Sequence, residues 1–166
     1  MVKAIVLYNS RGGNTKKVAM KIAEGLGVEC KDHRHIPDLK DYDLVVVGTW
    51  IIMGRISFAG ARYLRKLQRR NLAGKKIALF MTSGGPDEIN PFTEKDPEPK
   101  TIKEVAFNQM EKNLKRSEGI EILQERFVCK GAIRMWKNAE PKDLIGHPSD
   151  EELAEAKAFG ERLKKI

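Results

Sequence analysis

The 166-residue chain lacks any apolar run that approaches the roughly 20 residues of a membrane-spanning helix. A first expected strand that already begins at Val2 leaves no room for a signal segment, so we expect a cytoplasmic protein. There are only two cysteines, Cys30 and Cys129, and they form no metal-ligand spacing with the three histidines. We therefore expect neither a disulfide nor a metal site. The length and a hydrophobic content of 41% predict one globular domain over residues 1–166.

Two familiar phosphate-binding patterns are also missing. The chain contains neither G-x-x-x-x-G-K-[ST], which nucleoside triphosphates need, nor G-x-G-x-x-G directly after a strand, which dinucleotides need. A phosphorylated receiver domain would place acidic residues at the end of its first strand, where this chain has Asn9 and Ser10. These absences exclude three common uses of an alternating strand and helix pattern.

A hydroxyl- and glycine-rich turn follows the first expected strand and precedes an amphipathic stretch from Thr15 to Leu26. Glycines let the backbone approach a ligand, hydroxyls donate hydrogen bonds, and a helix N-terminus favours negative charge. The turn therefore predicts a phosphate site. Its candidate residues are Ser10, Arg11, Gly12, Gly13, Asn14 and Thr15. The alternative is a plain strand-to-helix connection in which Asn14 or Thr15 caps the helix.

Strands alternate with helices along the rest of the chain, which is the pattern of a parallel sheet covered on both faces. The β-branched run from Leu44 to Gly48 is typical of a central strand, and Ser149 and Glu152 have capping-box spacing before the last helix. We expect strands at residues 3–7, 28–33, 44–48, 76–81 and 120–129, and helices at 15–26, 58–71, 101–117 and after 149.

Two further loops should meet the glycine-rich turn, because ligands of a doubly wound sheet bind beyond the carboxyl ends of the strands. Their candidate residues are Thr49, Trp50, Ile51, Ile52, Met53 and Gly54 after the third strand, and Thr82, Ser83, Gly84 and Gly85 after the fourth. Trp50 can stack on a flat aromatic ligand, and Gly85 lets a backbone come close. Trp50 is equally compatible with packing in the core. Gly85 is equally compatible with an ordinary turn.

Four residues of the first turn, Ser10, Gly13, Asn14 and Thr15, resemble the FMN-binding pattern S/T-x-T/S-G-N-T of the flavodoxin family. The segments 48–55, 127–131 and 146–148 are also similar to that family, chiefly to its short-chain branch, so the resemblance covers essentially the whole chain. It implies a three-layer, doubly wound α/β fold, with a five-stranded parallel sheet in the order 2-1-3-4-5 and FMN held by the candidate residues. Gly12 departs from the pattern and removes a hydroxyl, which either weakens binding or is compensated by Arg11.

The resemblance implies an electron-transfer protein that shuttles single electrons between redox partner proteins. The alternative is an FMN-dependent oxidoreductase of the NAD(P)H:quinone reductase or protoporphyrinogen dehydrogenase type, because the loop after strand three is also similar to the latter. The loop after strand four lacks an obvious tyrosine for the outer flavin face; either Phe92 substitutes or that face is open. We hypothesise that a backbone carbonyl between Ile51 and Gly54 turns to accept a hydrogen bond from the protonated N5 of the one-electron-reduced flavin.

Positive charge is concentrated between Arg55 and Lys76, where eight basic residues and no acidic one account for the formal net charge of +8. This basic stretch is either a solvated helix face or a docking surface for an acidic redox partner. Few aromatic residues interleave with it and no recognition motif accompanies it, which disfavours nucleic acid. Two long connections, at 84–100 and 132–148, exceed usual loop lengths. The first is a candidate for partner recognition or a plain linker.

Overall fold

Five strands run parallel in the order β2-β1-β3-β5-β6 in a computed structural model, which describes residues 2–131 and 146–166. The strands are β1 (Ala4–Tyr8), β2 (Cys30–Asp32), β3 (Leu44–Ile52), β5 (Lys76–Ser83) and β6 (Glu121–Lys130). A short strand, β4 (Arg55–Ile56), pairs antiparallel with the end of β3. Because β5 and β6 are the fourth and fifth parallel strands along the chain, the predicted order 2-1-3-4-5 is confirmed.

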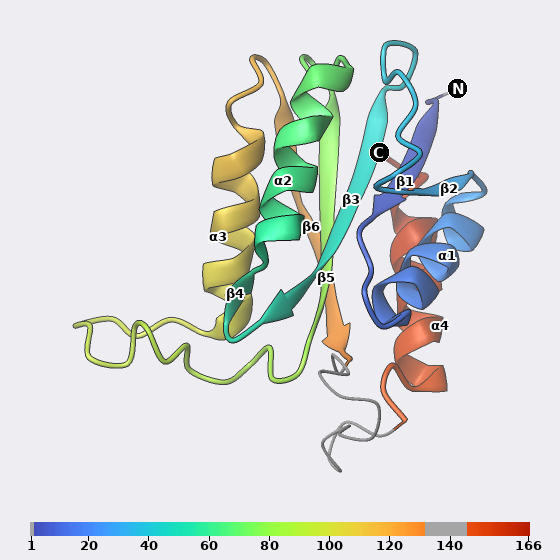
Figure 1. The fold of residues 1–166 in the computed structure, drawn as a ribbon. Helices are drawn as coiled ribbons and strands as arrows, with labels where there is room; N and C mark the ends of the chain where they lie inside the picture. The colour runs from blue at the N-terminus through green and yellow to red at the C-terminus, as the bar shows by residue number, and fades with distance from the viewer. Residues whose placement is uncertain (1, 132–145) are drawn as a thin grey trace.

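Helices cover both faces of the sheet (Figure 1). On one face lie α1 (Asn14–Leu26) and α4 (Asp150–Leu163). On the other lie α2 (Phe58–Leu67), its 3-10 extension Gln68–Arg70, and α3 (Ile102–Leu114). The three-layer prediction is confirmed, and so is the capping box of Ser149 and Glu152 at the start of α4. Within the described residues no helix is long and apolar enough to cross a membrane.

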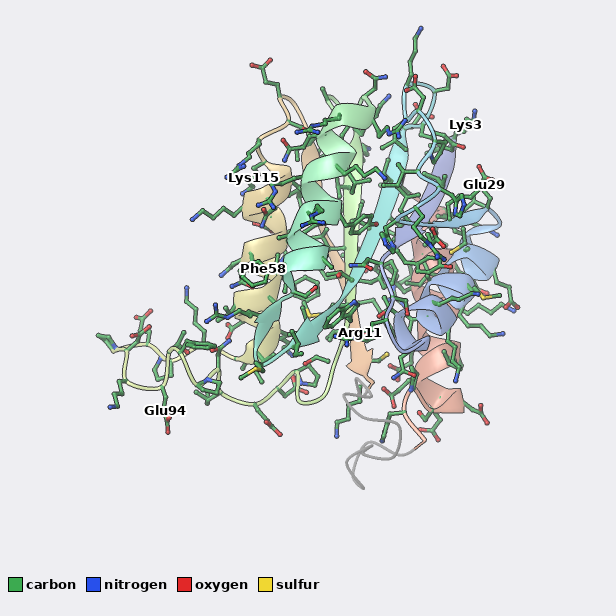
Figure 2. The ribbon with its side chains drawn as sticks, viewed as in Figure 1. Lys3, Arg11, Glu29, Phe58, Glu94 and Lys115 are labelled. Atoms are coloured by element: carbon green, nitrogen blue, oxygen red, sulfur yellow. The ribbon has the colours of Figure 1, made fainter. Side chains whose placement is uncertain are left out.

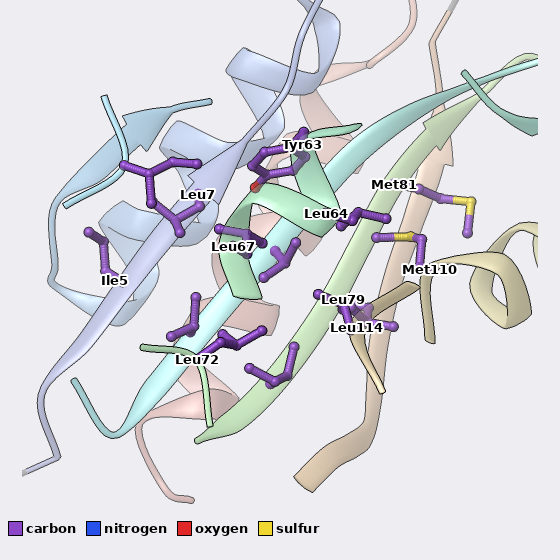
Figure 3. Packing of buried hydrophobic residues seen from close by; sticks show 14 of the residues in the cluster. Ile5, Leu7, Tyr63, Leu64, Leu67, Leu72, Leu79, Met81, Met110 and Leu114 are labelled. Atoms are coloured by element: carbon purple, nitrogen blue, oxygen red, sulfur yellow. The ribbon is translucent and has the colours of Figure 1, made fainter. Parts of the chain in front are cut away.

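The sheet separates two hydrophobic clusters, because alternate side chains of each strand point to opposite faces. Leu7 and Leu79 pack with Leu64 of α2 and Met110 of α3 in the cluster drawn in Figure 3. On the other face, strand residues such as Val6, Val46 and Phe80 pack with Ile22 of α1 and Phe159 of α4. The central strands β1, β3 and β5 are therefore apolar on both faces, as the run from Leu44 predicts.

Two close contacts depend on glycine, one with an aromatic ring and one between helix backbones. A Cβ added to Gly48 would lie 1.9 Å from the Phe80 ring, so the ring occupies the space that a side chain on β3 would need. The helices α1 and α4 cross at a reciprocal pair of glycines: a Cβ on Gly25 would lie 2.0 Å from the carbonyl oxygen of Lys157, and one on Gly160 2.2 Å from that of Ile22. These two helices therefore pack backbone against backbone.

The boundaries predicted from the sequence were wrong by two or more residues in three strands, β2, β3 and β5, the last of which continues to Ser83. The third strand continues past Gly48 to Ile52, because Thr49 and Trp50 pair with β5 and the last two residues then pair with β4. The segment predicted as an apolar loop is thus mostly strand. The second strand is reduced to Cys30–Asp32 at the edge of the sheet. Cys30 and Cys129 are free thiols on opposite edge strands, as predicted. The connection predicted at 132–148 lies outside the described residues up to position 145.

Replacing Gly160 with alanine tests the helix crossing. Alanine normally stabilises a helix interior relative to glycine, but here the added methyl group would collide with α1. We expect Gly160→Ala to lower the free energy of unfolding by about 1–3 kcal/mol in urea denaturation. Glu161→Ala, one residue along on the exposed face of α4, is the control and should change stability by less than about 0.5 kcal/mol. Equal stability of the two variants would contradict the crossing.

Candidate functional site

The three predicted loops meet at the carboxyl edge of the sheet, which is the lower edge in Figure 1. The backbone N–H of Asn9, just after β1, donates to the carbonyl of Gly48 on β3 at 3.0 Å. The hydroxyls of Thr15 on α1 and Thr82 on β5 share a buried hydrogen bond of 2.8 Å. These bonds tie the glycine-rich turn to β3 and β5, so the structure gathers the candidate residues of all three loops at one edge.

The glycine-rich turn leaves the start of α1 without a side-chain cap. Gly13 occupies the N-cap position in the left-handed region, with φ at 92°, and its N–H donates to the Ser10 hydroxyl oxygen at 3.2 Å. Asn14 and Thr15 lie inside the helix, so the alternative in which one of them caps it is wrong. An uncapped helix start presents backbone N–H groups that suit an anion.

The surroundings of this helix start are positively charged. Its first turn holds no acidic residue, and the first acidic residue of the chain is Glu24. Arg11, Lys16 and Lys17 are exposed there, and Figure 2 shows Arg11 at the edge where the strands end. Cations together with the positive end of the helix dipole favour a negatively charged ligand at the turn.

Trp50 is buried in β3 with a polar atom that has no protein partner. By the alternation along β3, its side chain lies on the face covered by α1, the same face as the Thr15 and Thr82 pair. The residue is 7% exposed, and its Nε1 makes no hydrogen bond. The side-chain nitrogen of Asn9 is buried and unpaired as well, whereas the unpaired hydroxyl of Thr49 lies against Gly60 of α2, on the opposite face of the sheet. Because buried polar groups are nearly always paired, the Trp50 and Asn9 nitrogens fit a polar ligand at the strand ends.

The residues after Ile52 form a tight turn rather than a broad loop. Met53 and Gly54 both have positive φ, at 51° and 78°, and join β3 to β4 as a two-residue hairpin turn. Met53 is 78% exposed. The Gly54 carbonyl accepts a hydrogen bond of 2.7 Å from the side-chain nitrogen of Asn90.

The loop after β5 begins later than predicted. Thr82 and Ser83 are buried strand residues, and Gly84 and Gly85 follow them half-buried. A Cβ on Gly85 would lie 2.5 Å from the carboxyl carbon of Glu88, so the space beside this glycine is filled by a side chain of the same loop.

The hypothesis that Phe92 covers an outer ligand face remains a prediction. The Phe92 ring is 59% exposed and lies under the Arg55 guanidinium, whose carbon is 4.1 Å from the ring centroid. The connection that carries Phe92 therefore contacts the β3–β4 hairpin.

The site residues predicted from the sequence did not include three residues of this region: Asn9, Gly131 and Asn90. A Cβ on Gly131 would lie 3.2 Å from that of Asn14, so this glycine lets the end of β6 approach the turn. The polar residues directly after the first strand are a local signal that could have included Asn9. Asn90 carries no such signal, because its contact with Gly54 joins positions 36 residues apart.

The cysteines do not add reactive groups to this chemistry. Burial raises the pKa of Cys30 to about 12 and also raises that of Cys129, so both are protonated near neutral pH. The donors gathered at the strand ends are instead hydroxyl, amide and indole groups.

A family model of the flavodoxin domain matches residues 5–140. The chain belongs to the flavodoxin domain family. It is 28% identical to the flavodoxin-like domain-containing protein BilS of Clostridioides difficile strain CD3, in an alignment that covers 98% of this chain and 96% of that protein.

Solved structures of flavodoxins and flavoproteins share the fold. A short-chain flavodoxin associated with a bacterial microcompartment superposes with a TM-score of 0.64 at 18% identity, covering 99% of this chain and 98% of the other. A flavoprotein from Lactobacillus acidophilus NCFM, solved in complex with FMN, gives a TM-score of 0.55 at 16% identity over 78% and 93% of the two chains. At these identities the likeness supports the fold of this flavodoxin domain.

The buried hydroxyl pair predicts non-additive stability effects. Thr15→Val or Thr82→Val alone should each cost about 1–3 kcal/mol of unfolding free energy, because each leaves the other hydroxyl buried without a partner. The double variant removes both hydroxyls and should cost clearly less than the sum of the two. Urea unfolding of the four proteins measures the coupling. Strictly additive costs would show that the hydrogen bond contributes nothing to joining α1 to β5.

Proposed function

We propose that this flavodoxin-domain protein binds FMN at the carboxyl edge of its sheet and carries single electrons between redox partner proteins. The observation that carries the proposal is the uncapped, acid-free start of α1 beside the buried, unpaired nitrogen of Trp50. Support also comes from the flavoprotein of the same fold that was solved in complex with FMN. Bound FMN would supply reversible one-electron chemistry.

The phosphate monoester is the part of FMN that the described residues fit best. The Ser10 and Thr15 hydroxyls, the first N–H groups of α1 and the Trp50 indole N–H are donors suited to it, and no acidic residue opposes its charge in the first turn of α1. Arg11 is exposed beside the turn, where it can supply the charge that compensates for the hydroxyl missing at Gly12.

The flavin ring is assigned to the β3–β4 hairpin and the start of the loop after β5. Ile51 to Gly54 supply apolar surface and backbone carbonyls, and Ser83 to Gly85 supply backbone N–H groups. A carbonyl of the hairpin turn is the acceptor that we assign to the flavin N5 proton after reduction. None of these groups is an acid, a base or a nucleophile near neutral pH, so the flavin itself would supply the redox chemistry in the carrier and in the oxidoreductase alternative.

The partner is proposed to be acidic, because the basic stretch offers uncompensated positive charge. Its side chains on α2 and the following 3-10 turn are exposed, and in the described part of the chain none of the eight basic residues forms an ion pair with an acidic one. The stretch begins at Arg55 in β4, beside the proposed flavin edge, and α2 then runs toward the opposite end of the sheet (Figure 1). Arg55 and Arg62 are therefore the cations of the basic stretch that lie nearest to the site.

Nucleotide titration of the apoprotein tests the cofactor. We expect FMN to bind and riboflavin, which lacks the phosphate, to bind at least about 100-fold more weakly. Trp50→Phe keeps an aromatic ring but removes the indole N–H, and should weaken FMN about tenfold or more with little effect on riboflavin. Phe58→Leu changes an exposed ring outside the loops and is the control. Equal losses for both ligands in Trp50→Phe would contradict a phosphate role.

The same holoprotein separates the carrier from the oxidoreductase. A carrier is expected to accumulate its one-electron-reduced form during stepwise reduction by dithionite or light and to consume NADH and NADPH slowly. Rapid, catalytic consumption of either nicotinamide with a quinone as acceptor would replace the electron-transfer proposal with the alternative.

Small charged oxidants test the electrostatics without a known partner. We expect the dithionite-reduced holoprotein to be oxidised by anionic ferricyanide about tenfold more slowly in Arg55→Gln/Arg62→Gln than in the wild type at low salt. The double variant Arg69→Gln/Arg70→Gln makes the same charge change about 10 Å further along the helix axis than Arg62, past the end of α2, and is the control. Stopped-flow absorbance measures the rates. Identical slowing in both variants would show that the nearer cations have no special role.

A further inference from the structure

Asn90 is a fully buried residue of the connection after β5 whose side chain reaches the β3–β4 hairpin. Its Nδ2 donates to the Gly54 carbonyl at 2.7 Å, and its Oδ1 accepts from the Phe92 N–H at 2.9 Å. Both ends of the amide are therefore engaged, one with its own loop and one with the turn.

The backbone around Asn90 is anchored independently of that side chain. The Asn90 N–H donates to the Lys100 carbonyl at 2.8 Å, and the Asn90 carbonyl accepts from the Thr93 N–H at 2.9 Å. The Thr93 hydroxyl oxygen also accepts from the Lys100 N–H at 2.9 Å. Hydrogen bonds thus join Asn90 and Thr93 to Lys100 within this proline-rich connection. The backbone that carries the Asn90 side chain is therefore held in place by contacts other than the one with the hairpin.

The hairpin turn that accepts this hydrogen bond has a backbone conformation that can change at Met53 and Gly54. Met53 has φ at 51°, a conformation that costs a non-glycine residue about 1–3 kcal/mol and that persists only when neighbours hold it. Gly54 has no side chain to restrict the peptide that follows it. A Cβ at Gly54 would lie 3.0 Å from the Asn90 nitrogen, so the amide fits against the bare glycine. The Asn90 side chain therefore donates a buried hydrogen bond to the carbonyl of a residue whose own side chain restricts nothing.

We propose that Asn90 is a positioning residue that sets the reduction potential of the bound flavin by restraining the Gly54 carbonyl. This inference rests on the proposed function. One-electron reduction adds an electron and, at N5, a proton, and a carbonyl that accepts this N–H stabilises the reduced state. When the Gly54 carbonyl turns away from Asn90 to accept this N–H, a buried amide is left without an acceptor. Asn90 thereby disfavours the first reduction step and lowers its potential.

The test is a redox titration of the FMN-loaded wild type, Asn90→Ala and Thr93→Val. Asn90→Ala frees the Gly54 carbonyl and should favour the first reduction about tenfold, which corresponds to a rise of about 59 mV for a one-electron couple. Thr93→Val removes hydroxyl contacts of the same connection but leaves the Asn90 side chain intact, so its potential should match the wild type. Asn90→Ser, whose side chain is too short for the contact, replaces Asn90→Ala where that variant does not fold.

Each outcome decides the proposal. An unchanged or lowered first potential in the Asn90 variants overturns it, and so does an equal rise in Thr93→Val, because the effect would then belong to the whole connection. A rise confined to the Asn90 variants supports it. Failure of the proposed function is distinct, since wild-type protein would then bind no FMN in the titration that precedes the redox measurement.

Discussion

Parallel pairing of β1, β3 and β5 is the constraint on which the remaining features depend. Strands that run side by side in one direction end at the same edge, so three segments far apart in the sequence are brought together there. Helix α1 begins at that edge as well, which places its positive dipole end beside Trp50 and Thr82. The apolar side chains of these strands stabilise the sheet. The polar groups that could bind a ligand belong to the few residues at and after the strand ends.

The sequence was sufficient for features that depend on local pattern. Strand order, layers, the last capping box and the meeting of three loops followed from periodicity, turn residues and a family resemblance. The end of β3 was missed because Thr49 to Ile52 become strand only through pairing with β5 and β4, which no local pattern encodes. Asn90 was missed for the same reason: its partner is brought near by the fold, and a polar residue in a proline-rich connection resembles any other turn former.

The charge distribution gives the two sides of the hairpin opposite signs. The basic stretch begins at Arg55, whereas the connection after β5 carries five acidic residues between Asp87 and Glu98. Figure 2 shows Glu94 at the outer end of that connection, away from Arg11. The electrostatic field near the hairpin therefore runs from the basic stretch to the acidic connection. This field would orient an approaching charged partner as well as attract it. Exposed Met53 and Phe58 add apolar contact surface to the same region.

The ring of Phe80 in the space beside Gly48 has an evolutionary consequence. The space between these two positions of adjacent strands holds only one side chain. A side chain at position 48 therefore fits only if the residue at position 80 is small. Homologues with alanine or a larger residue at position 48 should therefore carry a small residue at position 80, so that the two columns vary together. Selection would then act on the two positions together. A lineage that moved the large side chain from position 80 to position 48 by single substitutions would have passed through an intermediate with either a cavity or a steric clash.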